Sequence, residues 1–235
     1  MFVKKDKILL FGFGRYGEQI GVNLVNSGYD LYVAEHSKDA LKKAKLDGIE
    51  NLYVVDIEND EEISSLILDH GFKRVFCAFE DEEKNIYLTI TIKALFKKVE
   101  VVALCESKES ERKLRLAGAD KVIDTMYAAA NRLYFVLEKP AVAEAMDHIL
   151  FKDPSIAFKE IEVPKGSFLD GVNLSGIDFH KMHIILLGLV DKELGNKFIF
   201  VTRGINHKID AGDILVVLGK KRDIEIFEQK LRGER

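Results

Sequence analysis

The chain has 235 residues, so it can form one large domain or two modest ones. A formal net charge of −4 argues against nucleic acid as a partner. No apolar stretch approaches the roughly 20 residues that cross a bilayer, and the short charged start does not resemble a secretory signal, so we expect a cytoplasmic protein. Cys77 and Cys105 lie in apolar runs and predict buried thiols rather than a disulfide.

A glycine-rich turn follows the first apolar run, residues 8–11, which predicts a strand. The turn has the pattern Gly-x-Gly-x-x-Gly, formed by Gly12, Phe13, Gly14, Arg15, Tyr16 and Gly17. It leads into an amphipathic helix that ends at Gly28. In a nucleotide-binding unit the first glycine permits a tight turn, the second lets a pyrophosphate approach the backbone, and the third lets the helix lie close to the strand. The free amides and positive dipole of the helix start favour an anion.

A second apolar run, residues 29–35, ends at an acid. Glu35 follows Gly17 by 18 residues, near the position at which an acid binds the ribose hydroxyls in such units. A carboxylate there repels a 2′-phosphate, which favours NAD(H) or an adenine nucleotide over NADP(H). The sequence therefore predicts a Rossmann-type unit at the N-terminus.

Strand and helix signals alternate through the first half of the chain. Further strands are expected at residues 51–55, 74–79, 99–105 and 121–124, with helices at 38–46, 58–68, 81–96 and 110–117. The strands are apolar at consecutive positions, as in parallel sheets that are buried on both faces. This pattern predicts an α/β fold with a doubly wound, six-stranded parallel sheet.

The alternation ends after the sixth strand. Residues 127–137 predict an apolar helix with no strand after it, and residues 141–150 predict another helix. An apolar helix that leaves a completed sheet must bury its stripe, and we favour burial against a second copy of the domain over burial against its own sheet.

From residue 158 the pattern becomes short strands and turns. Strands are expected at residues 158–163, 184–190, 197–202 and 214–218, an irregular segment at 169–174, a turn at 193–196, and a closing helix at 220–231. We therefore divide the chain into a nucleotide-binding domain (1–137), a helical linker (138–157) and a small α+β domain (158–235).

With both halves considered, the chain resembles the RCK/KTN family, the cytoplasmic regulators of potassium channels and of Trk and Ktr potassium transporters. The glycine turn and the segment 112–123 are similar to the family's TrkA-N domain. The segments 162–167 and 211–219 are similar to its TrkA-C domain, and two such segments at the right separation are more specific than the glycine turn alone.

The resemblance implies a non-enzymatic gating domain that binds a nucleotide, pairs through the helix after the sixth strand and assembles as an octameric ring beneath a pore. The partner would be a potassium-channel pore or a Trk/Ktr membrane subunit, which places the chain at the inner face of the membrane. NAD(H) is the favoured ligand, with ATP or ADP as the alternative. The ligand would have to bind one ring shape better than another in order to gate the pore.

The resemblance also suggests the residues around the nucleotide. The glycine turn would surround the phosphates, and Glu35 with His36 would contact the ribose. Asp56 and Ile57 would flank the adenine, and Ala78 and Phe79 would face the second half of the ligand. Many transporter regulators carry a Gly-Asp-Ala-Thr-like segment where this chain has residues 55–58, and only the aspartate matches.

Two other groups of side chains could bind a metal ion. Glu80, Asp81 and Glu106 follow neighbouring strands and could bind calcium, although acids at a helix start also complement its dipole. His180 and His183 lie three residues apart without a third ligand, so we favour surface histidines over zinc.

The enzyme alternative is an NAD-dependent oxidoreductase, but no tyrosine is followed by lysine four residues later, the pair that short-chain dehydrogenases use. The second half also lacks an evident His/Asp or Cys/His constellation. A soluble nucleotide or redox sensor that acts on another protein is the third alternative.

Overall fold

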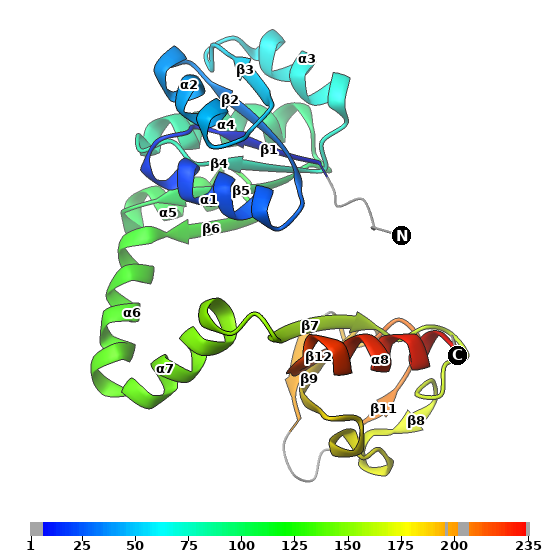
Figure 1. The fold of residues 1–235 in the computed structure, drawn as a ribbon. Helices are drawn as coiled ribbons and strands as arrows, with labels where there is room; N and C mark the ends of the chain where they lie inside the picture. The colour runs from blue at the N-terminus through cyan, green and yellow to red at the C-terminus, as the bar shows by residue number, and fades with distance from the viewer. Residues whose placement is uncertain (1–6, 196, 202–206, 234–235) are drawn as a thin grey trace. The chain divides into compact units, whose positions relative to one another are not determined.

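The computed structural model describes residues 7–195, 197–201 and 207–233. The chain divides into two compact units, residues 1–134 and 135–235 (Figure 1). The division falls inside helix α6 (Thr125–Glu138), whereas the sequence analysis placed the end of the first domain at residue 137.

The first unit contains a six-stranded, all-parallel sheet with the order β3-β2-β1-β4-β5-β6. Its strands are β1 (Lys7–Phe11), β2 (Asp30–Glu35), β3 (Asn51–Val54), β4 (Arg74–Cys77), β5 (Glu100–Cys105) and β6 (Lys121–Asp124). The order reverses between β1 and β4, and in open parallel sheets a ligand binds at the carboxyl ends of the strands beside that reversal. The predicted doubly wound sheet is confirmed.

Helices cover both faces of this sheet, as Figure 1 shows. They are α1 (Arg15–Asn26), α2 (Lys38–Leu46), α3 (Asp60–His70), α4 (Glu82–Leu95) and α5 (Lys108–Leu116). Helices α2 to α5 each begin with a side chain that accepts a backbone N–H, as expected of N-caps. The capping residues are Ser37, Asn59, Asp81 and Ser107.

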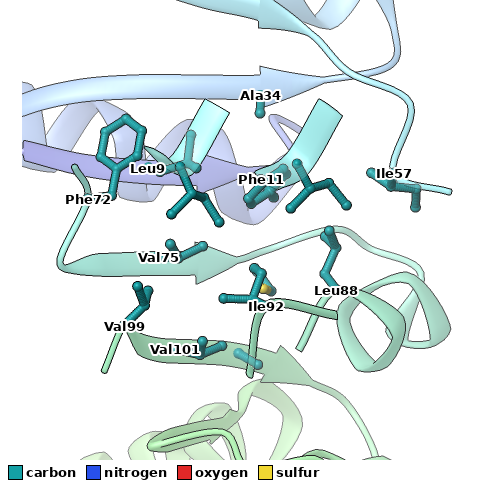
Figure 2. Close-up of a cluster of buried hydrophobic side chains, with 14 of the residues drawn as sticks. Leu9, Phe11, Ala34, Ile57, Phe72, Val75, Leu88, Ile92, Val99 and Val101 are labelled. Atoms are coloured by element: carbon teal, nitrogen blue, oxygen red, sulfur yellow. The ribbon is translucent and has the colours of Figure 1, made fainter. Parts of the chain in front are cut away.

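The strand β1 alternates its side chains between the two faces. Leu9 and Phe11 pack in the cluster that contains α3, α4 and α5, whereas Ile8 and Leu10 pack in the cluster that contains α1 and α2. Figure 2 shows Leu9 and Phe11 on the first of these faces, above Leu88 and Ile92 of α4 in the same cluster. Because both faces are covered, β1 is buried from Ile8 to Phe11, and the turn that follows it is held on a rigid strand.

Helix α6 continues from β6 and is followed by α7 (Pro140–Asp147) and a π-helical turn, His148–Lys152. Pro140 occupies the first turn of α7, where its missing N–H costs no hydrogen bond. Both helices predicted after the sheet are confirmed.

The second unit contains a four-stranded antiparallel sheet with the order β10-β9-β12-β7 and a separate pair, β11-β8. Its elements are β7 (Ile156–Glu162), β8 (Val172–Asn173), β9 (Ile184–Asp191), β10 (Lys197–Phe200), β11 (Lys208–Ile209), β12 (Ile214–Lys220), α8 (Lys221–Arg232) and the 3-10 turns Leu174–Gly176 and Phe179–Met182. Helix α8 packs Ile224, Phe227 and Leu231 into the core of the unit. The small α+β domain is confirmed.

Two short strands of the second unit were not predicted. The structure has the two-residue strand β11, where no strand was expected, and the two-residue strand β8 within residues 169–174, which were expected to be irregular. The predicted strand 197–202 is present as Lys197–Phe200, and Thr202 lies outside the described residues, as do Asn196 of the predicted turn and residues 1–6 at the start. No helix among the described residues is both long and apolar enough to span a bilayer.

Candidate nucleotide-binding site

The turn between β1 and α1 requires glycine at two positions. Gly12 has φ +89°, and a Cβ atom added to it would lie 2.8 Å from the Phe79 nitrogen. A Cβ atom on Gly17 would lie 2.0 Å from the Gly12 carbonyl oxygen. The first and third glycines therefore let the turn pass close to β4 and let α1 begin directly against the turn.

The start of α1 lacks a side-chain cap of its own. Gly14 is the N-cap residue and makes no side-chain hydrogen bond, so the first amides of α1 depend on other groups for acceptors, and the positive end of the helix dipole favours an anion there. Gly14 has φ −81°, a value that any residue can adopt, and the nearest atom to an added Cβ would be Glu80 Oε1 at 2.8 Å. Glycine at this position is therefore explained by the close approach of another group, here the Glu80 carboxylate, and not by the backbone conformation of Gly14.

Glu35 is only 4% exposed and holds the turn from the end of β2. Its Oε2 accepts the Phe13 N–H at 2.9 Å, and its Oε1 accepts the N–H groups of His36 at 2.8 Å and Ser37 at 3.0 Å. The His36 Nδ1 lies 2.7 Å from the same Oε1. In this arrangement the carboxylate links the glycine turn to the start of the β2–α2 loop.

Two further carboxylates surround Arg15 and Tyr16. Glu80 Oε1 accepts the Arg15 backbone N–H at 2.9 Å and lies 3.3 Å from Arg15 Nε. Glu106 Oε1 accepts the Tyr16 hydroxyl at 2.8 Å and lies 4.0 Å from Arg15 Nη2. The hydrogen bond from the Arg15 amide, aided by the guanidinium charge, holds the pKa of the Glu80 carboxyl below its ordinary value.

The structure brings most of the other predicted contact residues to the same sheet edge. Ala78 is fully buried and Phe79 is 6% exposed, and the Phe79 ring lies 5.9 Å from the His36 ring, measured between centroids. Ile57 is nearly buried after β3, and Asp56 is exposed, its Oδ1 accepting the Glu58 N–H at 3.0 Å. The Phe13 side chain is 2% exposed and belongs to the core, so only its backbone could meet a ligand.

Two further residues shape this edge: Asn85, which the sequence did not single out, and Glu82, which belongs to the acidic run after β4. Asn85 is 1% exposed; its amide side chain accepts the Phe79 N–H at 2.9 Å and donates to the carbonyl oxygens of Phe79 and Leu104 at 2.9 and 3.0 Å. Glu82 accepts the N–H groups of Glu106 and Ser107. Asn85 lies near the start of α4, directly after three charged residues, so nothing in the local sequence indicates that it is buried and needs these partners.

The cation candidates are occupied by hydrogen-bond donors. Glu80 and Glu106 bind the start of α1, and Asp81 caps α4 by accepting the Glu83 N–H at 3.0 Å. Within the part of the chain that the structure describes, no group of three His, Cys, Asp or Glu side chains could hold a metal ion. His180 and His183 are exposed.

Two open hollows lie on the first unit away from the glycine turn. One, of about 550 Å³, is lined by Ile57, Glu58, Asp81, Glu83, Lys84 and Tyr87. The other, of about 590 Å³, lies on α4 and α5 and is lined by Ile86, Ile90, Lys93, Ala94, Lys113, Leu116 and Ala117. The first is close to the expected adenine contacts, whereas the second is an apolar groove on the outside of the helices.

Both halves of the chain match a family model. The TrkA-N domain matches residues 8–125, half of the chain, and the TrkA-C domain matches residues 158–232. These ranges correspond to the parallel-sheet unit and to the antiparallel-sheet domain.

Curated relatives include membrane transport proteins of greater length. A probable potassium channel protein 2 of Methanocaldococcus jannaschii is 25% identical over 246 residues, which cover 98% of this chain and 68% of that protein. A glutathione-regulated potassium-efflux system protein KefC of Escherichia fergusonii is 26% identical over 50% of this chain and 19% of its own length. The chain thus spans two thirds of one relative and about a fifth of the other.

Solved structures with the same fold include the GsuK RCK domain, with a TM-score of 0.50 and 17% identity over 97% of this chain and 47% of that one. The GsuK channel bound to NAD has a TM-score of 0.50 and 16% identity over 98% of this chain and 39% of that one. GsuK bound to ADP has a TM-score of 0.50 and 20% identity over 59% of this chain and 35% of that one. These structures share the fold of the chain, and the two family models show that it belongs to the family of proteins that join a TrkA-N domain to a TrkA-C domain.

Proposed function

We propose that this chain is a nucleotide-binding regulatory domain that controls a potassium channel or potassium transporter. The observation that carries the proposal is the β1–glycine turn–α1 unit, with Glu35 at the end of β2, in a chain that also has a TrkA-C domain. The potassium channel and potassium-efflux relatives support the transport role.

The ligand is an adenine nucleotide, with NAD(H) favoured and ADP or ATP as the alternative. GsuK relatives bound to NAD and to ADP support this choice. The buried carboxylate of Glu35 at the ribose position disfavours a 2′-phosphate, because a second negative charge there would lie against the first.

Each part of the site has an expected role. The phosphates lie over Gly14 and the first amides of α1, next to the Arg15 guanidinium. Glu35 and His36 contact the ribose, which requires the Glu35 carboxylate to exchange some of its backbone partners for hydroxyl groups. Asp56 and Ile57 flank the adenine, and Phe79, behind Gly12, faces the rest of the ligand.

The first partner in this proposal is a second copy of the chain, with which it forms a dimer. Helix α6 carries an apolar stripe at helical spacing, and no residue of α6 is buried within the described part of the chain. The stripe consists of Met126, Ala129, Ala130, Leu133, Val136 and Leu137. Pairs formed through this stripe would build an octameric ring, using further surfaces such as the groove on α4 and α5, and the ring would act on a pore subunit from the cytoplasmic side of the membrane.

The proposal is not an enzymatic one. A regulator must bind its nucleotide without converting it, and the nucleotide must favour one conformation of the assembly over another. A dehydrogenase would instead need an acid or base placed against the nicotinamide.

Isothermal titration with NAD⁺, NADH, ADP and ATP tests the site on the wild type, on Gly14→Val and on Gly176→Val. The added side chain in Gly14→Val occupies the surface that the phosphates need, so nucleotide affinity should fall by more than about tenfold. Gly176→Val lies in the second unit with no atom within 4 Å of an added Cβ, and it should bind as the wild type does. Equal affinity in Gly14→Val and the wild type would place the nucleotide elsewhere.

A further inference from the structure

The anion position at the start of α1 is already taken by a side chain of the protein itself. Glu80 Oε1 accepts the Arg15 N–H at 2.9 Å, lies 3.3 Å from Arg15 Nε, and would be 2.8 Å from a Cβ on Gly14. The carboxylate therefore lies over the second glycine of the turn, against the amide and the guanidinium that a phosphate would use.

Glu80 comes from the loop between β4 and α4, which is firmly held. Asn85 fixes the backbone of Phe79 with two hydrogen bonds, and Asp81 caps α4 directly after Glu80. The Glu80 side chain itself is 47% exposed, so it can turn away from α1 without moving this backbone. A rigid backbone with a partly exposed side chain allows the Glu80 carboxylate to leave this position when a phosphate binds.

The negative charges around Arg15 oppose the binding of a phosphate at the start of α1. Arg15 is the one cationic side chain paired with Glu80 in the described part of the chain, and Glu106 Oε1 lies 4.0 Å from the same guanidinium. A pyrophosphate placed over Gly14 would meet the Glu80 charge at a few ångströms, and like charges at that distance repel.

We propose that Glu80 is a specificity-determining residue that competes with the phosphates of the nucleotide for the start of α1. The proposal rests on the function proposed above and adds a property of the same site. Nucleotides bind once Glu80 has swung away, so its carboxylate sets the affinity for phosphate-bearing ligands and has no effect on ligands without phosphate. The bound nucleotide then replaces Glu80 as the anion at the start of α1.

The contacts of Glu80 fit this role better than cation binding. The backbone N–H and the Nε–H of Arg15 both donate to Glu80 Oε1. A carboxylate oxygen that accepts two hydrogen bonds is not positioned to bind a metal cation. Glu106 is engaged with the Tyr16 hydroxyl at 2.8 Å.

Isothermal titrations of ADP and of adenosine, in the presence of EDTA, test the proposal on the wild type, E80Q, E80A and E50Q. E80Q keeps an oxygen that can accept from Arg15 but removes the charge, and E80A clears the position. The control E50Q removes a charge from an exposed residue directly before β3, at the opposite edge of the sheet. We expect ADP affinity to rise about fivefold to tenfold in E80Q and at least as much in E80A, as for the loss of one nearby like charge at a protein surface. Adenosine affinity should stay at the wild-type value in all variants, and E50Q should match the wild type for both ligands.

The outcomes separate this proposal from the one on which it rests. If ADP binds the wild type and E80Q with equal affinity, or binds E80Q more weakly, Glu80 does not compete and the proposal fails while the nucleotide site stands. A parallel gain in adenosine affinity would also overturn it, because the effect would not depend on phosphate. If neither ADP nor adenosine binds any of the four proteins, the nucleotide function itself fails and this inference fails with it.

Discussion

At the scale of single residues, Gly17 is fixed by a contact rather than by its backbone conformation. A methyl group on Gly17 would lie 2.0 Å from the Gly12 carbonyl oxygen and 4.0 Å from a methyl carbon of Leu10. Backbone atoms cannot move aside as a flexible side chain can, so the turn or the start of α1 must shift. The intrinsic preference of a helix for alanine over glycine acts in the opposite direction, by about 1 kcal/mol.

We therefore predict that Gly17→Ala lowers the free energy of unfolding of the first unit by about 2 kcal/mol, net of that preference. The change is measured as the shift in the urea midpoint of far-UV circular dichroism. Gly176→Ala, where nothing lies within 4 Å, is the matched control and should leave the midpoint in place. A Gly17→Ala midpoint equal to that of the wild type would mean that the turn opens freely.

The sequence predicted where the candidate site lies, but it did not predict which side chains contact one another there. The spacing of Gly12, Gly14, Gly17 and Glu35 placed a turn, a helix start and an acid at one sheet edge, and the structure has them there. It could not predict that Glu80 reaches the Arg15 amide, because that contact joins residues 65 positions apart and depends on how the β4–α4 loop packs.

At the scale of elements, the strands of the first unit could be predicted because strands that are buried on both faces have uninterrupted apolar runs in the sequence. Helix starts were predicted less exactly: the helix expected at residues 58–68 begins at Asp60, because Asn59 is its capping residue. The pair β8 and β11 could not be predicted, since a two-residue strand has no period to detect and exists only through its partner.

The end of the first sheet is held by an acid with a shifted pKa. Asp120 Oδ2 accepts the Val101 N–H at 2.7 Å and the Lys93 ammonium at 2.9 Å, which ties the α5–β6 loop to β5 and α4. Burial raises the pKa of the Asp120 carboxyl, but these two donors together outweigh it, so the pKa lies below the ordinary value of 3.8. A carboxyl whose pKa is lowered by folding stabilises the folded state above its unfolded pKa and loses that effect as the pH falls toward the folded one.

We expect Asp120→Asn to be less stable than the wild type at pH 7, and the difference to shrink as the pH falls below 3.8. Urea midpoints of both proteins between neutral and acidic pH measure it. Asp47→Asn, which neutralises an exposed acid at the end of α2, should follow the wild type throughout. A constant difference between Asp120→Asn and the wild type at every pH would show that the lost packing, and not the charge, matters.

At the scale of the whole molecule, the chain joins a unit that can hold a nucleotide to a unit of a different fold class. The apolar stripe of α6 has no buried member within the described part of the chain, although such stripes stabilise a protein only when they leave water. Sequence periodicity predicted this stripe, but one chain cannot show what covers it, because the covering surface belongs to another molecule in the proposed assembly.

The stripe makes the proposed assembly testable with a pair of matched substitutions. Leu133 is 66% exposed and lies within the stripe, whereas Asn131 is exposed on the opposite side of the same helix. Leu133→Asp places a carboxylate where dimerisation would bury it, so we expect the dimer dissociation constant to rise by more than about tenfold, measured by sedimentation equilibrium. Asn131→Asp adds the same charge to α6 outside the stripe and should dimerise as the wild type does. If Leu133→Asp retains the wild-type dimer, α6 does not form the contact between copies; if both variants weaken it equally, charge on the helix is the cause and the stripe has no special part in assembly.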